Sequence, residues 1–241
     1  MKTYGLIGKN ISYSFSRNYF TEKFGKLGMH DCQYLNFDLN SIESFPAILR
    51  EDVKGLNVTI PYKEQIMPFL DAIDNEARTI GAVNTIKISG GILTGYNTDA
   101  IGFEKALMPF LKTFHKKALV LGTGGASKAV KYVLEKLGIA VSTVSRHPKG
   151  HIIGYDTIDR DCMNSHLLIV NCTPLGTFPG VEAHPEIPYQ YISSRHILFD
   201  LIYNPTETTF LRKGSEQGAK TVNGLKMLEF QAEAAWRIWN M

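Results

Sequence analysis

Residues 118–126 read ALVLGTGGA, a short apolar run that ends in a glycine-rich turn. The turn, Gly122 to Ala126, opens a helical pattern over 127–137. Because glycine has no Cβ atom, the backbone of such a turn can approach a pyrophosphate, whose charge is stabilised by the free N–H groups and the positive dipole of the helix start. The stretch therefore predicts a nucleotide site, although a purely structural strand-to-helix turn uses the same small residues.

The next strand pattern, 139–144, indicates which nucleotide binds, because it ends in Ser145 and Arg146. A dinucleotide fold selective for NAD usually carries an acid there, about 20 residues past the glycines, to bind the ribose 2′-hydroxyl. This chain has no acid at that point. Arg146, helped by Lys149, instead offers cationic donors that suit a 2′-phosphate, so we expect NADP as the cofactor. An exposed basic loop without a ligand would have the same composition.

The composition is that of a globular protein with room for two domains, since 44% of the 241 residues are hydrophobic and 20% are charged. No apolar run approaches the roughly 20 residues that span a bilayer. The N-terminus, MKTYGLIGKN, reads as a strand and a turn rather than a signal peptide. We therefore expect a cytoplasmic protein without membrane association.

The net charge of +3 is small, and the basic residues are not gathered with aromatic ones, so nucleic-acid binding is disfavoured. Anionic small molecules remain plausible ligands. The three cysteines have no CxxC spacing, and the seven histidines show no ligand motif. We accordingly expect neither a disulfide framework nor a metal site.

Strand and helix patterns alternate along the first part of the chain, which favours a mainly parallel sheet flanked by helices. A glycine-containing turn, 89–91, joins the last two of these strands. We expect strands at 4–7, 32–37, 55–59, 83–88 and 91–95, and helices at 16–27, 41–50 and 66–81.

The later elements complete a two-domain α/β fold. A linking helix at 99–114 precedes the nucleotide unit, whose later strands are 167–171 and 196–200. The final helix, 225–239, should pack back on the first domain through Leu228, Ala232, Ala235, Trp236 and Trp239. We therefore predict a discontinuous α/β substrate domain with a mainly parallel sheet (1–98 and 224–241) and a Rossmann-like NADP domain (99–223).

One connection in this scheme is too short. Only about seven residues separate the strand at 139–144 from the next candidate strand, 152–157, whereas a parallel crossover takes a dozen or more. Either the segment 146–152 is a bare extended crossover, or 152–157 is not a ladder strand.

Three polar segments lie where predicted strands end: SYSFS (12–16), NVTIPYK (57–63) and NTD (97–99). Singly, each has an ordinary explanation as a helix cap, a turn or a solvated lysine. Ligands of open α/β sheets bind beyond the carboxyl ends of strands, where these hydroxyls, amides and charges would converge. Together with an NADP fold, they favour a site for a polyhydroxylated acid.

Seven motifs taken together closely resemble the shikimate dehydrogenase family over nearly the whole chain. The resemblance implies an oxidoreductase acting on a CH–OH group, which reduces 3-dehydroshikimate to shikimate with NADPH on the route to chorismate and the aromatic amino acids. The motifs are GLNVTIPYKE, GAVNTI, GYNTDAIGF, LGTGGASKAV, NCTPLG, DLIYNPTET and NGLKMLEFQA.

The resemblance also implies roles for individual residues. Lys63 matches the family's catalytic lysine, which exchanges the hydroxyl proton while hydride moves between carbon and nicotinamide, and Asp99 matches its acidic companion. The substrate carboxylate would meet Ser14, Ser16, Thr59 and Tyr203, and the ring hydroxyls would meet Asn84, Asp99 and Gln231. The cofactor would contact Gly122, Thr123, Gly124, Gly125, Ala126, Ser145, Arg146, Lys149, Thr173, Pro174, Leu201 and Gly224.

Several positions depart from the family pattern. Arg17 replaces a usual proline, Ser145 a common asparagine and Lys226 a common glycine, and the nucleotide domain is short. The alternatives are therefore a quinate/shikimate dehydrogenase that uses NAD or both cofactors, and a non-catalytic sensor on the same scaffold. A folate-type dehydrogenase lacks support from the serine and NTD segments. We expect a monomer or homodimer that binds shikimate or 3-dehydroshikimate in a cleft.

Overall fold

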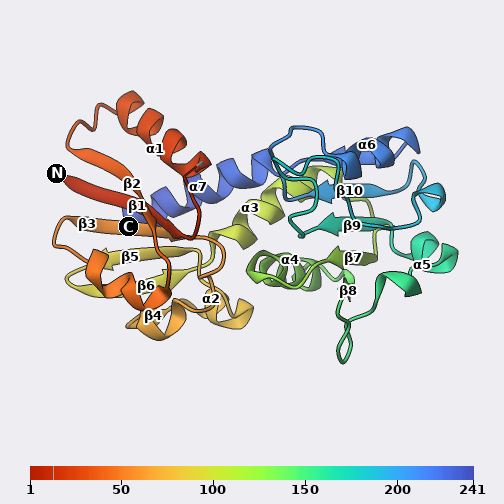
Figure 1. The fold of residues 1–241 in the computed structure, drawn as a ribbon, viewed down its shortest axis with the longest axis horizontal. Helices are drawn as coiled ribbons and strands as arrows, with labels where there is room; N and C mark the ends of the chain where they lie inside the picture. Colours follow the sequence, from red (N-terminus) through yellow and green to blue (C-terminus); the bar gives the residue numbers. More distant parts are fainter. Residues whose placement is uncertain (13) are drawn as a thin grey trace. The chain divides into compact units, whose positions relative to one another are not determined.

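The computed structural model describes residues 1–12 and 14–241. These residues form two compact units, each with its own sheet (Figure 1). Unit 1 comprises residues 1–98 and 232–241, and unit 2 comprises residues 99–231. The expected α/β class with two sheets is confirmed. Residues 224–231, which the sequence pattern placed with the first domain, belong to unit 2.

Unit 1 is built on a mixed six-stranded sheet with the order β2-β1-β3-β5-β6-β4. The inner strand β1 is parallel to β2 and β3, β4 is parallel to β6, and the β3-β5-β6 pairs are antiparallel. Gly90 and Gly91 have positive φ angles of 58° and 79°, which the tight turn between β5 and β6 requires. The strands are β1 (Lys2–Gly8), β2 (Cys32–Asp38), β3 (Val53–Val58), β4 (Ala72–Ile73), β5 (Thr85–Ser89) and β6 (Ile92–Tyr96).

The first helix, α1 (Phe15–Lys26), agrees with the prediction, whereas the helices predicted at 41–50 and 66–81 are wrong in type or extent. The first is the 3-10 helix η1, which contains Pro46, a residue without the N–H that an α-helix needs. In the second, Leu70 takes extended backbone angles after Pro68, and the Asp74 side chain starts a new helix by accepting from Glu76 N. The observed elements are η1 (Ile42–Ile48), η2 (Met67–Phe69), β4 and α2 (Asn75–Ile80).

The last turns of α7 (Leu225–Trp239) belong to unit 1. Trp239 is 7% exposed, and its indole Nε1 donates to the Ile86 carbonyl at 3.0 Å. Its ring lies 5.0 Å from that of Tyr4 and 5.1 Å from that of Phe20, between centroids. The expected packing of this helix face is thus seen at its C-terminal end.

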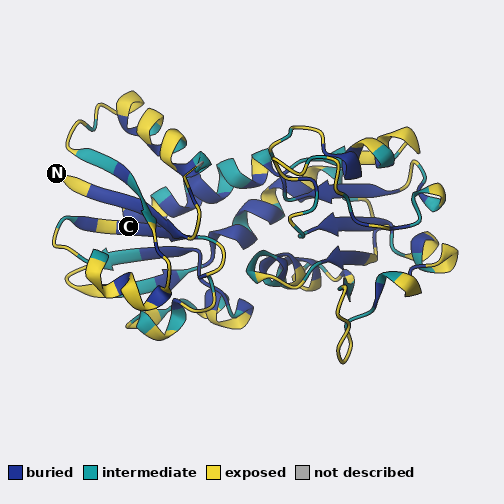
Figure 2. Ribbon diagram, in the orientation of Figure 1, coloured by how far each residue is buried: buried dark blue, intermediate teal, exposed yellow. Residues whose placement is uncertain are grey.

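Unit 2 is a Rossmann-like α/β unit around a five-stranded, fully parallel sheet with the order β11-β10-β9-β7-β8. Strands β7, β9 and β10 are almost entirely buried (Figure 2), as expected for the centre of such a sheet. The strands are β7 (Lys117–Leu121), β8 (Ala140–Val144), β9 (Leu168–Asn171), β10 (Ile197–Asp200) and β11 (Lys220–Val222).

The helices of unit 2 correct two further predictions. The linking helix α3 ends at Leu107 rather than near 114, because Pro109 cannot continue the hydrogen-bond ladder and a 3-10 helix follows. Helix α6 and strand β11 had no counterpart in the sequence reading, although Thr208 is a typical N-cap. The helices are α3 (Thr98–Leu107), η3 (Met108–Phe110), α4 (Gly125–Lys136), η4 (Tyr155–Thr157), α5 (Arg160–Ser165), η5 (Tyr189–Tyr191) and α6 (Thr209–Glu216).

The structure shows which of the two alternatives for the short crossover after β8 is correct. The segment 152–157 is not a ladder strand, because only Ile153 bridges to Val144, with its N–H donating to the Thr143 carbonyl at 2.9 Å. The chain then passes through η4 and the short helix α5 before it enters β9. The second of the two alternatives left open by the sequence is therefore correct.

Within the described residues, none of the helices combines the length and the apolar character that a membrane crossing requires.

We predict that Gly55→Ala destabilises the protein by about 1–3 kcal/mol, because an added Cβ would overlap a well-packed ring. A Cβ at this position would lie 2.4 Å from Trp239 Cδ1. Urea unfolding followed by circular dichroism measures the loss.

Gly25→Ala is the matched control, since a Cβ there has no neighbour within 4 Å and the position lies in α1. Alanine in a helix should leave stability unchanged or raise it by about 0.5–1 kcal/mol. Equal unfolding midpoints for the two variants would show that the Trp239 ring does not constrain position 55.

Candidate functional site

The start of helix α1 carries the two predicted carboxylate-binding serines. Ser14 is the N-cap, and its side chain accepts a hydrogen bond from Arg17 N at 3.4 Å. Ser16, in the first turn, is 7% exposed. The first turn contains no acidic side chain, so the positive end of the helix dipole is not neutralised within α1. Tyr13, in the same predicted segment, lies outside the described residues.

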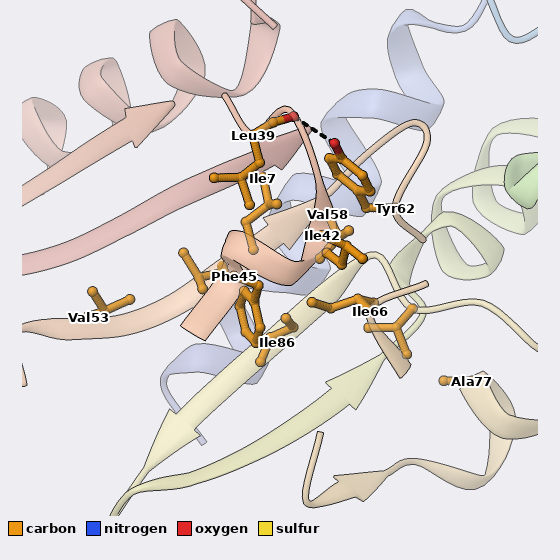
Figure 3. Packing of buried hydrophobic residues seen from close by; sticks show 12 residues of the cluster. Ile7, Leu39, Ile42, Phe45, Val53, Val58, Tyr62, Ile66, Ala77 and Ile86 are labelled. Atoms are coloured by element: carbon orange, nitrogen blue, oxygen red, sulfur yellow. Dashed lines mark hydrogen bonds between the residues drawn. The ribbon is translucent and has the colours of Figure 1, made fainter. Parts of the chain in front are cut away.

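The loop after β3 carries Thr59 and Lys63 and is held to the core at both ends. Thr59 N donates to the Ile7 carbonyl at 2.8 Å. The buried Tyr62 donates its hydroxyl to the Leu39 carbonyl at 2.6 Å (Figure 3). The half-buried Lys63 therefore follows directly on an anchored residue.

A buried hydrogen bond connects this region of unit 1 to the beginning of α3. The Lys63 carbonyl accepts from Val83 N at 2.7 Å. The next residue, Asn84, is 3% exposed, and its Oδ1 accepts from Thr98 N at 2.7 Å. The structure therefore shows Asn84 fixing the residue before Asp99, a structural role that the sequence reading had not included.

Asp99 and Gln231 are both buried side chains of unit 2, at 6% and 7% exposure. Helices α3 and α7 approach each other closely at Gly102, where a Cβ would lie 2.5 Å from the Met227 carbonyl oxygen and 3.0 Å from Gln231 Cβ. Gly102 is one turn after Asp99 on the same helix face. The predicted pairing of Asp99 with Lys63 joins residues of different units and stays a prediction.

The predicted pyrophosphate turn has the backbone that its glycines were expected to allow. Gly122 has a φ of 107°, in the region that favours glycine, and a Cβ added there would approach Thr173 Cγ2 to 3.2 Å. Gly124 is the N-cap of α4, and a Cβ there would meet nothing within 4 Å. The first turn of α4 has no acidic side chain. The helix start is thus open to an anion.

A cavity of about 610 Å³ in unit 2 includes two of the predicted cofactor residues, Ser145 and Arg146. Lys149 and the glycine turn do not line it. Its other lining residues were not predicted as site residues. Apart from Leu175, which belongs to the NCTPLG motif, they come from loops without a recognisable motif, and three of them are acidic. They are Pro148, Gly154, Tyr155, Asp156, Leu175, Glu182, Ala183, His184 and Glu186.

The carboxyl ends of β9 and β10 are joined by side-chain hydrogen bonds. Asn171 Nδ2 donates to Asp200 Oδ1 at 3.0 Å, and Asn171 Oδ1 accepts from Thr173 Oγ1 at 2.7 Å. Leu201 N donates to the Asn171 carbonyl at 3.0 Å. Gly224 is needed beside Leu201, because a Cβ would lie 2.1 Å from the Leu201 oxygen. Three predicted cofactor residues, Thr173, Leu201 and Gly224, thus lie at or beside the hydrogen bonds of Asn171 and Asp200. The predicted substrate residue Tyr203 is half-buried just beyond β10.

The family model described as the shikimate dehydrogenase substrate binding domain matches residues 6–86. A shikimate dehydrogenase (NADP(+)) of Methanococcus maripaludis is 37% identical over 257 aligned positions, which cover 99% of this chain and 91% of the relative. The chain belongs to the shikimate dehydrogenase family.

Solved structures of the family share this fold. A shikimate 5-dehydrogenase from Thermus thermophilus, in complex with NADP(H) and shikimate, is 31% identical with a TM-score of 0.87, over 99% of this chain and 93% of that one. A quinate dehydrogenase from Corynebacterium glutamicum, in complex with NAD, is 26% identical with a TM-score of 0.85 and the same coverage of both chains.

We predict a pH dependence of stability from Asp200, whose side chain is fully buried at the end of β10. Burial raises the pKa of this carboxyl from 3.8 to about 6, although hydrogen bonds from Thr208, Ile202 and Asn171 act in the opposite direction. Because the folded pKa exceeds the unfolded one, the native state binds more protons between these values. The contribution of Asp200 to stability should therefore fall by about 2–3 kcal/mol as the pH rises from 4 to 6.

Urea unfolding of the wild type and of Asp200→Asn at successive pH values isolates this effect. The stability difference between the two proteins should change in favour of the asparagine variant as the pH rises. A difference that stays constant from pH 4 to 6 would contradict the raised pKa.

Proposed function

We propose that the protein catalyses the reversible, NADP-dependent reduction of 3-dehydroshikimate to shikimate. The observation that carries this proposal is the match to a shikimate dehydrogenase (NADP(+)) over 99% of the chain. The complex of the Thermus thermophilus enzyme with NADP(H) and shikimate supports the same pair of small-molecule ligands. The roles of individual residues follow from their chemistry.

The start of α1 is proposed to bind the substrate carboxylate. The Ser14 oxygen accepts from Arg17 N, so its own O–H proton remains available as a donor to an anion. Ser16 adds a second hydroxyl in the first turn, and the helix dipole favours the negative charge. Thr59 and Tyr203 are proposed to complete the carboxylate contacts. Asn84 and Gln231 are proposed to hold the ring hydroxyls.

Lys63 is proposed to move the proton of the reacting oxygen. When a ketone becomes an alcohol, the oxygen gains a proton as the carbon gains hydride, and the reverse reaction removes it. An ammonium donates this proton in the reduction, and the resulting amine accepts it in the oxidation. Asp99 is proposed to orient the lysine and to contact the substrate beside the same oxygen through its carboxylate.

The glycine turn, the start of α4 and Arg146 fit a dinucleotide with a 2′-phosphate, whereas three acidic residues of the cavity lining do not. The open Gly124 position and the uncompensated start of α4 suit a pyrophosphate. Arg146 and Ser145 line the cavity beyond β8 and would bind the 2′-phosphate. NADPH, when bound, supplies the hydride to the substrate carbon. The lining residues Asp156, Glu182 and Glu186 would repel a phosphate, so its binding in this cavity would depend on the positive charge of Arg146.

A quinate dehydrogenase activity with NAD is the second candidate, because the quinate dehydrogenase of Corynebacterium glutamicum has the same fold. Its identity of 26% is lower than the 31% of the Thermus thermophilus enzyme with NADP(H) and shikimate in the same comparison, which favours shikimate and NADP. Turnover with each acid and each cofactor, followed by the absorbance of the reduced nicotinamide, distinguishes the two. The cytoplasmic location and the monomeric or homodimeric state stay predictions.

Lys63→Ala should lower kcat for 3-dehydroshikimate reduction by about 10²- to 10⁴-fold, because the reacting oxygen loses its proton donor. Steady-state NADPH consumption measures the effect, and circular dichroism should show an unchanged fold. Lys54→Ala is the matched control, since Lys54 is exposed and its Nζ donates to the nearby Glu51 carbonyl at 2.8 Å. A kcat of Lys63→Ala within twofold of the wild type removes Lys63 from the mechanism.

Arg146→Ala should weaken NADP binding by about 10- to 100-fold, because a charge-assisted contact to the 2′-phosphate is lost. NAD lacks this phosphate, so its affinity should change little. Fluorescence titration of both cofactors measures the ratio, with Arg160→Ala on α5 as an exposed control. An equal loss of affinity for NADP and NAD would show that Arg146 does not contact the 2′-phosphate.

A further inference from the structure

Glu233, on α7, connects that helix to α1 within unit 1. Its carboxylate accepts hydrogen bonds from the Tyr19 hydroxyl and from Lys23 Nζ, the latter at 2.7 and 2.9 Å to its two oxygens. The Lys23 side chain is only 19% exposed, and its Nζ lies 5.8 Å from the centroid of the Trp236 ring. Both donors belong to α1, so a single carboxylate holds α1 against α7 at two points.

An aromatic pair extends this contact to the beginning of α1. The Tyr19 ring stacks on that of Phe15, with 5.5 Å between centroids and an interplanar angle of 27°. Residues four apart lie on the same face of a helix, so the pair spans the first turn. Phe15 is the first residue of α1 and stands between Ser14 and Ser16. Glu233 is thus connected, through Tyr19 and Phe15, to the turn that carries both proposed carboxylate-binding serines.

The first turn of α1 needs such support, because the N–H groups at the start of a helix lack intrahelical partners and helix ends fray. The hydrogen bond from Arg17 N to the Ser14 side chain is long, at 3.4 Å. The large buried side chains of α1, Phe20 and Phe24, pack on the core of unit 1 further along the helix. The stacked pair of Phe15 and Tyr19 therefore stabilises the part of the helix that precedes this packing.

The Glu233 side chain is ionised at neutral pH. Burial raises its pKa, but the hydrogen bonds from Lys23 and Tyr19 and the positive charges of Lys23 and Arg237 outweigh burial, so the pKa lies below its ordinary value. An ionised acceptor forms shorter and stronger hydrogen bonds than a neutral one. Tyr19 is therefore held by a charge-assisted bond.

We propose that Glu233 is a positioning residue, which holds the first turn of α1 in place for the substrate carboxylate. A turn that is already ordered loses less conformational freedom when the substrate binds, so more of the binding energy appears as affinity. Glu233 acts through Tyr19 and Phe15 rather than by contact with the substrate. This inference rests on the proposed function, because it takes the carboxylate to bind at Ser14 and Ser16.

Glu233→Ala tests the proposal, because it removes the acceptor of Tyr19 and Lys23 and leaves a good helix former on α7. We expect the KM for shikimate to rise about three- to tenfold, since a charge-assisted bond is lost and the turn must be ordered on binding. The kcat and the KM for NADP should stay within twofold, because Lys63, Asp99 and the cofactor residues are unchanged. A folding defect alone would lower the apparent kcat or the amount of folded enzyme and leave both KM values as they are. An unchanged KM for shikimate overturns the proposal.

Glu229→Ala is the matched control, because it removes a glutamate of the same helix that pairs with Lys226 of α7, at 2.6 Å, instead of with α1. The KM for shikimate of this variant should equal that of the wild type. A rise as large as that of Glu233→Ala would show that loss of any ion pair on α7 has this effect, and would overturn the role of Glu233.

Tyr19→Phe shows whether Glu233 acts through Tyr19, because it keeps the ring that stacks on Phe15 and removes the hydroxyl. Alone, it should raise the KM for shikimate at least about twofold, from the lost hydrogen bond. In a Glu233→Ala background it should have no further effect. An unchanged KM in Tyr19→Phe, or additive effects in the double variant, contradicts the proposal.

The same experiments separate this inference from the proposed function. Tyr19→Phe changes one hydroxyl and decides the question by itself if Glu233→Ala does not fold. If the wild-type enzyme shows no turnover of shikimate with NADP, the proposed function fails. An active wild type, combined with Glu233→Ala and Tyr19→Phe variants whose KM for shikimate is unchanged, contradicts the positioning role alone.

Discussion

The hydrogen bond from Thr98 N to Asn84 Oδ1 is the interaction on which the candidate site of unit 1 depends. Both residues are buried, so loss of this bond would carry the penalty of a desolvated N–H group, about 1–3 kcal/mol. The bond fixes the residue that precedes Asp99. The Lys63 carbonyl is held by Val83, the neighbour of Asn84. The Asn84 amide thus fixes the residue before Asp99, and the backbone of its neighbour Val83 holds the Lys63 carbonyl.

The same amide belongs to a larger group of buried polar side chains. Thr85 Oγ1 contacts Asn84, Asn57 and Thr98, and the Tyr34 hydroxyl on β2 extends the group by its hydrogen bond to Asn57. Such a network specifies one arrangement, because each member loses a partner if another moves. The network thus joins β2, β3, the start of β5 and the residue at the start of α3 within unit 1.

In unit 2, glycines leave space at the proposed cofactor site, and polar side chains fix the strand ends beside it. Gly122, Gly124 and Gly224 make room for close backbone approach or for a ligand, and no other residue type fits Gly224 against the Leu201 oxygen. Asn171 and Asp200 instead fix the neighbouring strand ends through hydrogen bonds. The acidic residues that line the cavity beside Arg146 come mostly from a loop far along the chain. Because these carboxylates would repel a phosphate, the proposed selectivity for a 2′-phosphate depends on a few cationic groups such as Arg146.

Local pattern alone determined most of the strands, helices α1, α4 and α7, the β5–β6 turn and the glycine turn, because alternation, helical periodicity and glycine preference act within a few residues. The family resemblance likewise named most of the proposed site residues. Helix 66–81 was wrong because the apolar spacing does not reveal that Pro68 and Asp74 interrupt it. Only the tertiary structure showed that Tyr34 meets Asn57, that Asn84 holds Thr98, and that Asp200 is buried with a raised pKa. Those properties arise from contacts between residues distant in sequence and from loss of water, which no local spacing encodes.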